Sequence, residues 1–285
     1  MAAADPEHHD DPEPDRFQRR RHRGHQQLMG VPLLSIITVV RDDPAGLAAT
    51  RDSLAAQVWQ GFEWLVADGG SCPATLAVLN TPGPIPHWLD SRPDGGPFAG
   101  MDRAMAVARG DYLLFLNAGD SLADDHVLAD LRSHLTACPD MLYGDSLEDP
   151  GDGVVRVKPS RHWRWAFYGM PAHHCAILYH RILVADLLMD QGYRIAGDYA
   201  FTLAALRRAA SVIRLPRVIA RFAPGGLSRR YAALGRAEQF RIRRTVLGVC
   251  ATVACTIWLL QIVASVIRGI SPSGYAFWRF RGPAG

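Results

Sequence analysis

The chain has 285 residues, of which 48% are hydrophobic and 21% are charged, and its formal net charge at pH 7 is +3. This composition excludes a disordered or collagen-like chain, and the small charge, without a basic stripe interleaved with aromatic residues, excludes a nucleic-acid-binding protein. The five cysteines form no CxxC pair, which predicts free thiols in a reducing compartment.

The first segment, residues 1–30, is a predicted tail. Acidic residues fill its first half, arginines fill its second half, and almost no apolar residue precedes Leu28. Such a segment cannot offset the entropy that ordering would cost, so we expect it to be disordered. A basic arm on anionic lipid is the alternative to a solvated tail, and the composition favours the tail. The acidic start carries no secretory signal pattern, so the folded part is expected in the cytoplasm.

Strands and helices alternate after this tail. Strands are expected at Leu33–Val40, Glu63–Ala67 and Tyr112–Leu116, because each is a short and continuous apolar run. The spacing of apolar residues predicts helices over Leu47–Val58 and Pro97–Arg109. This alternation predicts an α/β fold with a Rossmann-like, mostly parallel sheet and helices on both faces.

The second half of the chain has a more mixed pattern. Short strands are expected at Asp140–Asp145 and Val154–Val157, and a helix that contains Asp198 is expected within Arg194–Arg208. Arg221–Arg230 is a glycine-rich and basic stretch, which predicts a loop.

An uncharged apolar run, Thr245–Ile267, lies near the carboxyl terminus. As a helix it would reach ~35 Å, against a hydrocarbon core of ~30 Å. A membrane-spanning helix, a helix in the membrane plane and a buried core helix are the three alternatives. More arginines precede the run than follow it, which favours a cytoplasmic catalytic part. We therefore divide the chain into a tail (1–30), a catalytic domain (31–235) and a membrane-associated helical segment (236–285).

Polar residues follow the carboxyl ends of the expected strands. In parallel sheets of this kind, ligands bind beyond these ends. Asp68 comes before two glycines, so its carboxylate can bind a base or sugar that approaches the backbone closely. Asp120 closes the turn after the third strand, where one or two carboxylates typically hold Mg²⁺ or Mn²⁺ against phosphates. No GxxxxGK[ST] or GxGxxG motif follows the first strand, which excludes P-loop and dinucleotide-binding sites.

Several motifs together resemble family 2 glycosyltransferases of the GT-A fold, over roughly residues 32–230. The resemblance is greatest to the small bacterial branch that builds capsular, exopolysaccharide or glycolipid sugars. The motifs are, in chain order, Ser35–Arg41, Asp68–Ser71, Asp94 with Gly96, Gly110–Asp120, His174–Tyr179, Ala196–Tyr199 and Gly225–Ser228.

The resemblance implies a role for each matching residue. Asp198 matches the catalytic base, which would take a proton from the acceptor hydroxyl. Asp120 would hold Mg²⁺ or Mn²⁺ against the diphosphate, and His174 would be either a further metal or phosphate ligand or a structural histidine satisfied by backbone. Donor binding is assigned to Val40, Arg41, Asp68, Gly69, Asp94, Asn117, Arg229 and Arg230. For Arg229 and Arg230 there are two alternatives, a clamp over the diphosphate and a solvated basic loop.

The chain departs from the family pattern at some site positions. Asn117 stands where the metal motif usually has its first carboxylate, and its neighbour is Gly119. Arg92 and Ala99 stand where acidic residues are frequent. These changes motivate the alternative to an active enzyme given below.

The resemblance implies an inverting, metal-assisted transfer of a sugar from a nucleotide-diphosphate sugar to a lipid-linked or polysaccharide acceptor. Its expected place is the bacterial cytoplasm, at the inner membrane. The alternative is a non-catalytic nucleotide-sugar-binding subunit that anchors a partner synthase at the membrane. A nucleotidyltransferase is disfavoured, because the glycine-rich, lysine-bearing first loop of such enzymes is absent.

Overall fold

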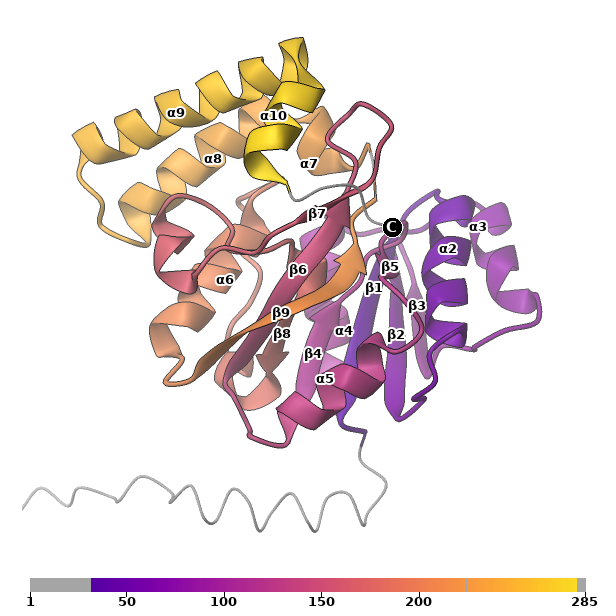
Figure 1. Ribbon diagram of the computed structural model, residues 1–285. Coiled ribbons are helices and arrows are strands. Elements are labelled where there is room, and N and C mark those ends of the chain that lie inside the picture. The colour runs from indigo at the N-terminus through magenta and orange to yellow at the C-terminus, as the bar shows by residue number, and fades with distance from the viewer. Residues whose placement is uncertain (1–31, 224, 281–285) are drawn as a thin grey trace, which may run out of the picture.

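The computed structural model describes residues 32–223 and 225–280, so the predicted tail lies outside the described residues (Figure 1). Within this part of the chain, nine strands form one sheet in the order β3-β2-β1-β4-β8-β6-β9-β5, and β7 pairs with β6. The strands are β1 (Leu34–Val40), β2 (Phe62–Asp68), β3 (Trp88–Ser91), β4 (Tyr112–Phe115), β5 (Ser121–Leu122), β6 (Met141–Glu148), β7 (Arg156–Lys158), β8 (Ile177–His180) and β9 (Val212–Arg221).

The pairing confirms the α/β class and refines the predicted sheet. Strands β3, β2, β1 and β4 are parallel neighbours, as expected from the alternating first half. Beyond β4 the sheet is mixed, since β8 is antiparallel to both β4 and β6, whereas β9 is parallel to β6. Parallel neighbours need a long crossover, usually helical. Short 3₁₀ helices precede β8 in place of a long helical crossover, which is consistent with its antiparallel pairing.

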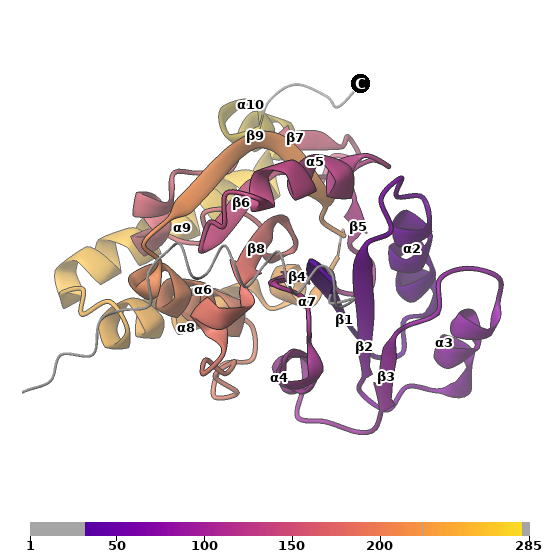
Figure 2. The ribbon, with the colours of Figure 1, turned by 90° about the horizontal axis from the view of Figure 1, so that it is seen from below.

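Helices cover both faces of the sheet, as Figure 2 shows for α2 and α4 beside β1 and β2. Successive strand residues point to opposite faces: Ile36 packs in a core with α2 and α5, and Ile37 packs in a second core with α4 and α6. The helices are α2 (Pro44–Ala55), α3 (Pro73–Ala77), α4 (Pro97–Val107), α5 (Val127–Leu135), α6 (Gly197–Arg208), α7 (Leu227–Arg230), α8 (Ala232–Thr245), α9 (Ala251–Ile270) and α10 (Pro272–Arg279).

The buried carboxylate of Glu63 connects the amino ends of β1, β2 and β4 by hydrogen bonds. Glu63 accepts hydrogen bonds from Ser35 Oγ at 2.6 Å and from the backbone N–H groups of Arg109 and Gly110 at 2.6 and 3.1 Å. Burial opposes ionisation of Glu63, but the hydrogen bonds from Ser35 and Arg109 hold its pKa below the ordinary value. A Cβ atom at Gly110 would lie 2.5 Å from the Ser35 nitrogen, so only glycine fits there. These contacts fix the register of the three strands. They thereby also fix the positions of the carboxyl ends of these strands.

The carboxyl-terminal helices α8, α9 and α10 gather at one end of the molecule, beside β6 and β7 (Figure 1). Ile242 of α8 packs in a third core with Tyr199 and Leu203 of α6. The predicted boundary at residue 235 falls inside α8. The division into domains therefore stays a prediction, and α8 connects both parts.

Candidate active site

The turn after β2 is built around Asp68, which is fully buried. Its carboxylate accepts hydrogen bonds from the backbone N–H groups of Gly70 and Ser71 at 3.1 and 3.0 Å and from the Ser91 hydroxyl at 2.6 Å. The Ser71 hydroxyl also donates to it. Burial alone would raise the pKa of Asp68, but the bonds from Ser71 and Ser91 lower it below the ordinary value.

Three of these bonds reach Oδ2 and one reaches Oδ1, from donors in the Asp68 turn and from Ser91 of β3. The predicted contact of Asp68 with a nucleotide base stays a prediction, and two of the four donors are hydroxyl groups that can rotate toward a ligand. Gly70 has φ = +81°, and a Cβ atom there would lie 2.9 Å from the Pro93 nitrogen. The turn therefore requires glycine at this position.

Asp94 lies in the loop before α4 and is held by two donors. The backbone N–H of Gly96 donates to its Oδ1 at 3.0 Å, and Arg103 donates to its Oδ2 at 3.1 Å. Arg103, a residue of α4, also lies 3.3 Å from Asp90 Oδ2 and donates to the Asp68 carbonyl at 3.3 Å. Arg103 thus ties together the ends of β2 and β3 and the Asp94 loop. The sequence reading missed it, because an arginine in an amphipathic helix carries no signal of its partners.

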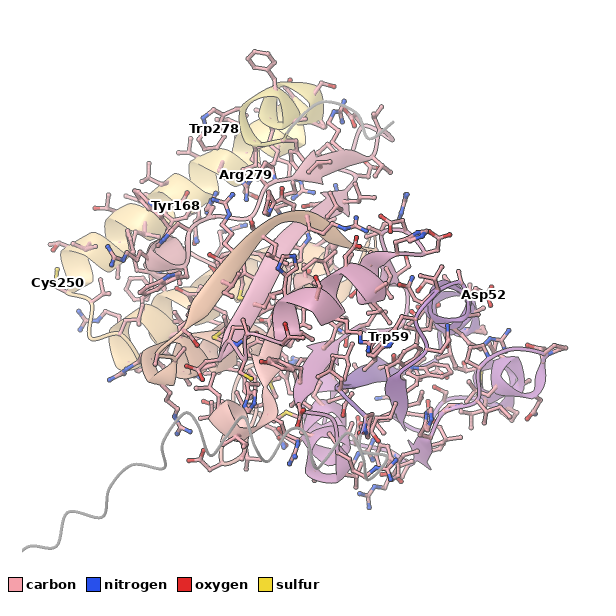
Figure 3. The ribbon with its side chains drawn as sticks, turned by 60° about the horizontal axis from the view of Figure 1, so that its bottom comes forward. Asp52, Trp59, Tyr168, Cys250, Trp278 and Arg279 are labelled. Atoms are coloured by element: carbon pink, nitrogen blue, oxygen red, sulfur yellow. The ribbon has the colours of Figure 1, made fainter. Side chains whose placement is uncertain are left out.

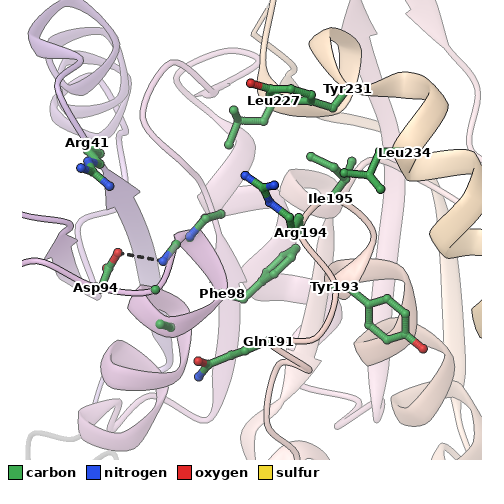
Figure 4. Close-up of a pocket in the computed structure, with 14 residues that line it drawn as sticks. Arg41, Asp94, Phe98, Gln191, Tyr193, Arg194, Ile195, Leu227, Tyr231 and Leu234 are labelled. Atoms are coloured by element: carbon green, nitrogen blue, oxygen red, sulfur yellow. Dashed lines mark hydrogen bonds between the residues drawn. The ribbon is translucent and has the colours of Figure 1, made fainter.

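A cleft opens beside Asp94, at the ends of these strands. Figure 4 shows Arg41 and Asp94 on one side, Gln191, Arg194 and Ile195 on the other, and Leu227 and Tyr231 above them. The lining residues are Arg41, Asp94, Gly95, Gly96, Pro97, Phe98, Ala99, Gln191, Tyr193, Arg194, Ile195, Leu227, Tyr231 and Leu234. Of the predicted donor-binding residues, Arg41 and Asp94 line this cleft.

Two arginines give the cleft a positive character. The Arg41 side chain is 66% exposed and lies only 3.9 Å from Asp42 Oδ2. Arg194 extends from the opposite wall into the space between the two sides (Figure 4). Guanidinium groups are suited to bidentate binding of phosphate, so the cleft can take an anionic diphosphate. Arg194 was not singled out from the sequence, since its place opposite Arg41 depends on the packing of the whole second half.

The turn after β4 holds the predicted metal ligands. Its Gly119 has φ = +95°, and the Asp120 N–H donates to the Asn117 carbonyl at 2.9 Å. Asp120 is 5% exposed, and its Oδ1 accepts a hydrogen bond from the Ala223 N–H at 2.9 Å. Burial raises the pKa of Asp120 to about 7, and no ion pair with a described residue offsets this shift.

The chemistry of this turn fits a hard divalent cation. The Asn117 amide oxygen is buried and has no hydrogen-bond partner among the described residues. An orphaned amide oxygen and an uncompensated carboxylate in one turn are the oxygen ligands that Mg²⁺ and Mn²⁺ prefer. Asn117 in place of a carboxylate therefore keeps an oxygen donor at the first position of the motif.

His174 lies buried against the end of β4. Its ring stacks on Phe115 with 4.6 Å between ring centroids, and neither ring nitrogen has a hydrogen-bond partner among the described residues. No backbone group of the described residues satisfies this ring, and its role as a ligand stays a prediction. Burial lowers the pKa of His174 to about 3, which favours the neutral ring, whose one unprotonated nitrogen can bind a metal or accept a hydrogen bond.

A different acidic group, Asp124 with Asp125 and His126, brings its ligand atoms within 4.8 Å of one another. All three residues are exposed, and Asp124 forms an ion pair with Arg217 at 2.7 Å. This group lies outside the predicted site.

Asp198 is the second residue of α6 and is partly exposed. It follows the loop 191–195, which lines the cleft. Burial raises the pKa of Asp198 to about 6, and the nearby Glu238 carboxylate adds to this shift. A carboxylate with a pKa near neutrality is suited to general-base catalysis.

Glu238 of α8 fixes the backbone just before Asp198. This 8% exposed carboxylate accepts hydrogen bonds from the N–H groups of three successive residues, Arg194, Ile195 and Ala196, at 2.8, 2.9 and 2.8 Å. This role is not visible in the sequence, because Glu238 lies 40 residues from Asp198, beyond the predicted domain boundary at residue 235.

The two arginines of the predicted clamp are engaged outside the cleft lining. Arg229 donates to the Pro150 carbonyl at 2.6 Å. Arg230 lies over the Tyr231 ring, 5.6 Å from its centroid. The clamp stays a prediction. Of the two departures from the family pattern, Ala99 lines the cleft, whereas Arg92 pairs with Asp90 at 3.0 Å.

Sequence comparison identifies the family of the chain. A family model described as glycosyl transferase family 2 matches residues 35–211. The chain is 31% identical over 206 residues to the PGL/p-HBAD biosynthesis glycosyltransferase of Mycobacterium tuberculosis, which covers 67% of this chain and 76% of that relative. The protein of the same name from Mycobacterium bovis matches equally well.

Solved structures support the same fold. The fold is similar to that of S. aureus TarS 1–349 in complex with UDP-GlcNAc, with a TM-score of 0.62 and 18% identity, over 86% of this chain and 75% of that chain. It is also similar to the mannosyltransferase from Pyrobaculum calidifontis in complex with GDP-Man and Mn²⁺, with a TM-score of 0.56 and 12% identity, over 92% and 86%. The family match and the mycobacterial relatives show that this chain belongs to glycosyl transferase family 2 and is a glycosyltransferase with a GT-A-like fold.

Proposed function

We propose that this glycosyltransferase moves a sugar from a nucleotide-diphosphate sugar to a lipid-linked or polysaccharide acceptor, with inversion at the anomeric carbon. The observation that carries this proposal is the placement of Asp198. Asp198 is not itself a lining residue, but it stands at the start of α6 three residues after Ile195 of the cleft wall, and burial raises its pKa to about 6. Inversion follows from a single displacement, in which one base on the acceptor side is sufficient.

The donor is proposed to occupy the cleft between β1 and the loop before α6. Arg41 and Arg194 face this space from opposite walls, which suits a diphosphate, and Gly69 of the Asp68 turn lies next to Arg41 and Asp94. The TarS structure contains UDP-GlcNAc and the Pyrobaculum structure contains GDP-Man, so proteins of this fold bind nucleotide sugars with different bases. Our proposal for this chain is limited to a nucleotide-diphosphate sugar.

In the proposed reaction, Asp198 accepts the proton of the acceptor hydroxyl while that oxygen attacks the anomeric carbon. The bond from this carbon to the diphosphate oxygen breaks, and the nucleoside diphosphate leaves with the electron pair. Glu238 holds the backbone that carries Asp198, so the base is positioned before the acceptor arrives. The positive charge of Arg41 and Arg194 favours the charge that develops on the leaving group.

We propose that Mg²⁺ or Mn²⁺ is the cofactor and that Asp120 and Asn117 hold it, with His174 as a further ligand to the metal or a phosphate. A divalent cation bound there would stabilise the negative charge of the departing diphosphate. The support is the orphaned Asn117 oxygen, the buried Asp120 carboxylate and the unpartnered ring of His174. The Pyrobaculum structure of similar fold contains Mn²⁺.

The proposed place of the reaction is the cytoplasmic face of a bacterial inner membrane, where a glycan or glycolipid acceptor would be attached. Among the described residues, α9 is the one helix long and apolar enough to cross a membrane. This feature supports membrane association, and the arginines that flank the helix favour a cytoplasmic catalytic part.

A transfer assay with labelled nucleotide sugars tests the proposed function. Purified full-length protein is incubated with UDP-, GDP- and dTDP-sugars and a bacterial membrane-lipid extract, with Mn²⁺ or with a chelator. We expect labelled product with one donor class in the presence of Mn²⁺ and an inverted anomeric configuration by NMR. A retained configuration would overturn the single-displacement mechanism, and transfer unaffected by the chelator would overturn the role of the metal.

A further inference from the structure

Helix α9 lies on the outside of the molecule with an apolar face toward solvent (Figure 3). Its 18-residue apolar core has a mean hydropathy of 1.9, and only 11% of that core is buried. Only Ala254 and Ile257 of this helix are buried, so the alternative of a core helix is wrong. The exposed large apolar residues of α9 are Val253, Trp258, Leu259, Leu260, Val263, Val266, Ile267 and Ile270.

Helix α10 continues this apolar surface. It folds back against α9, and its Phe277 and Trp278 are 93% and 72% exposed. The Arg268 guanidinium of α9 lies over the Tyr275 ring of α10, 5.6 Å from its centroid, and this contact links the two helices. Soluble proteins rarely leave so many adjacent large apolar side chains exposed without a partner.

The polar face of α9 is fastened to the catalytic part of the chain. Gln261 donates to the Tyr168 carbonyl at 2.8 Å, and Ser265 Oγ accepts a hydrogen bond from Arg236 at 3.2 Å. Arg268 donates to Glu148 at 2.6 Å. Residues 261, 265 and 268 have the spacing of one helix face, so the apolar face is directed away from the domain.

These contacts distinguish a helix in the membrane plane from one that spans the bilayer. In the spanning arrangement, the polar groups of Gln261 and Ser265 would leave these partners for the hydrocarbon core. Arg268 would at the same time lose its ion pair with Glu148, which would keep only Lys158 as a cationic partner. In the plane of the surface, every one of these contacts persists while the apolar face enters the lipid.

The charge around this surface matches anionic lipid. From residue 227 to the carboxyl end the sequence contains one acidic residue, Glu238, which is buried in contact with the α6 loop. Exposed tryptophans such as Trp278 are typical of the membrane interface. The arginines of the same stretch that are exposed are Arg230, Arg241 and Arg244.

We propose that α9 and α10 together form a docking surface that lies in the plane of an anionic lipid bilayer, with the catalytic part bound to their polar side. Helix α8 connects this surface to the site, since Leu234 lines the cleft while Arg236 and Gln239 contact α9. The cleft is thus one helix away from the lipid. The inference that a lipid-borne acceptor reaches the cleft rests on the proposed function. The inference of a docking surface does not depend on that function.

Vesicle flotation of the full-length protein tests this inference. We expect flotation with vesicles of phosphatidylglycerol and phosphatidylcholine, markedly less with phosphatidylcholine alone, and release of the bound protein by alkaline carbonate. Retention after carbonate would show a spanning helix and overturn the proposal. Failure to float with either lipid would also overturn it, and so would a stable dimer in lipid-free solution that buries this face.

Single substitutions locate the surface. Leu259→Glu on α9 and Phe277→Glu on α10 are each expected to reduce vesicle binding about tenfold, because an apolar side chain leaves the lipid. Ile85→Glu is the matched control, since Ile85 is 76% exposed and lies in the loop after α3. All three variants replace exposed residues, so their thermal midpoints should equal that of the wild type. Flotation that is unchanged in both helix variants, or reduced equally in the control, would overturn the assignment. Nucleotide binding should persist in every variant, which separates this test from that of the proposed function.

Discussion

At the scale of single residues, the account depends on three aspartates in different environments. Asp68 accepts hydrogen bonds from its own turn and from Ser91, Asp120 is buried with no ion pair among the described residues, and Asp198 is partly exposed near the carboxylate of Glu238. An aspartate side chain can therefore stabilise a turn, bind a metal or accept a proton, and the surroundings of each aspartate determine its role.

Asp198→Asn is expected to lower transfer by about 10²–10⁴-fold while nucleotide-sugar binding is retained, because the amide keeps the shape of the side chain but cannot accept the proton. Initial rates of transfer and calorimetric titration with the donor provide the two measurements. Asp52→Asn, which changes a largely exposed carboxylate on α2, serves as the control. Normal transfer by Asp198→Asn would show that another group is the base.

The pKa of Asp198 also predicts a pH dependence. Burial raises this pKa to about 6, so the base becomes protonated and inactive as the pH falls through that value. The rate at saturating donor should therefore decline below pH 6, with a midpoint near 6 rather than near the ordinary aspartate value. A pH profile between 5 and 8 measures this midpoint. A rate that is constant down to pH 5 would contradict the assignment.

The sequence located the main candidate residues but not their partners. Asp68, Asp120 and Asp198 stand at strand ends or a helix start, positions that the hydrophobic pattern defines. Arg103, Arg194 and Glu238 act through residues far away in the chain, so they become visible only when the elements are packed.

At the scale of secondary-structure elements, glycines set the shape of the turns around the cleft. Gly70→Ala is expected to destabilise the protein by about 1–3 kcal/mol, because its positive φ is strained for alanine and the new Cβ atom would meet the Pro93 nitrogen. Gly226→Ala is the control, since its φ is −58° and no atom lies within 4 Å of the added Cβ. Denaturant unfolding measures both variants. Equal stability of the two variants would contradict the turn geometry.

The clamp between α8 and the loop before α6 gives a further prediction. Glu238→Gln replaces a carboxylate that accepts three backbone N–H groups by an amide with one acceptor oxygen, which should cost about 1–3 kcal/mol of stability. Transfer should fall as Asp198 becomes less well positioned. Because the Glu238 charge raises the pKa of Asp198, the acid midpoint of the rate should also move to lower pH.

Thermal unfolding and the pH profile of Glu238→Gln measure these effects, and Glu238→Asp should restore part of the stability. A loss of stability with an unchanged acid midpoint would show that Glu238 supports the fold without acting on Asp198.

The sequence pattern predicted the first half of the fold better than the second half. The buried strands β1, β2 and β4 are continuous apolar runs, and the structure places them within one or two residues of the predicted bounds. The edge strand β3 alternates between exposed and partly buried residues over only four positions, and β9 contains Pro216 and several arginines. Their strand character comes from pairing with neighbours and not from local composition.

At the scale of the whole molecule, a buried ionic cluster joins the carboxyl-terminal helices to the sheet. Glu148 at the end of β6 contacts Lys158 at 2.6 Å, His173 at 3.2 Å and Arg268 of α9 at 2.6 Å. Burial disfavours the charged form of Glu148, but the cations Lys158 and Arg268 and the hydrogen bond with His173 hold its pKa well below the ordinary value. The sequence predicted an apolar helix at this end of the chain, but the run without charges carried no signal of its attachment.

Glu148→Gln is expected to release α9 from the sheet, because it leaves Lys158 and Arg268 without their counter-charge. Removal of one partner of a buried ion pair typically costs about 3–5 kcal/mol. Limited proteolysis in the connection between α8 and α9, residues 246–250, should therefore become faster. Asp186→Asn, which removes an exposed ion pair with Arg208, should leave cleavage unchanged. Equal cleavage of the two variants and the wild type would contradict the role of the cluster.

The most direct test of the central claim is a thermal-shift measurement with UDP, GDP and dTDP, each with and without Mn²⁺, on the wild type and on Asp120→Ala. A ligand that binds only the folded state raises the unfolding temperature, so no acceptor needs to be known. The account predicts a Mn²⁺-dependent shift for at least one nucleotide in the wild type and its loss in Asp120→Ala. No shift with any nucleotide, or a shift that Asp120→Ala retains in full, would contradict a metal-assisted nucleotide-sugar site at the end of β4.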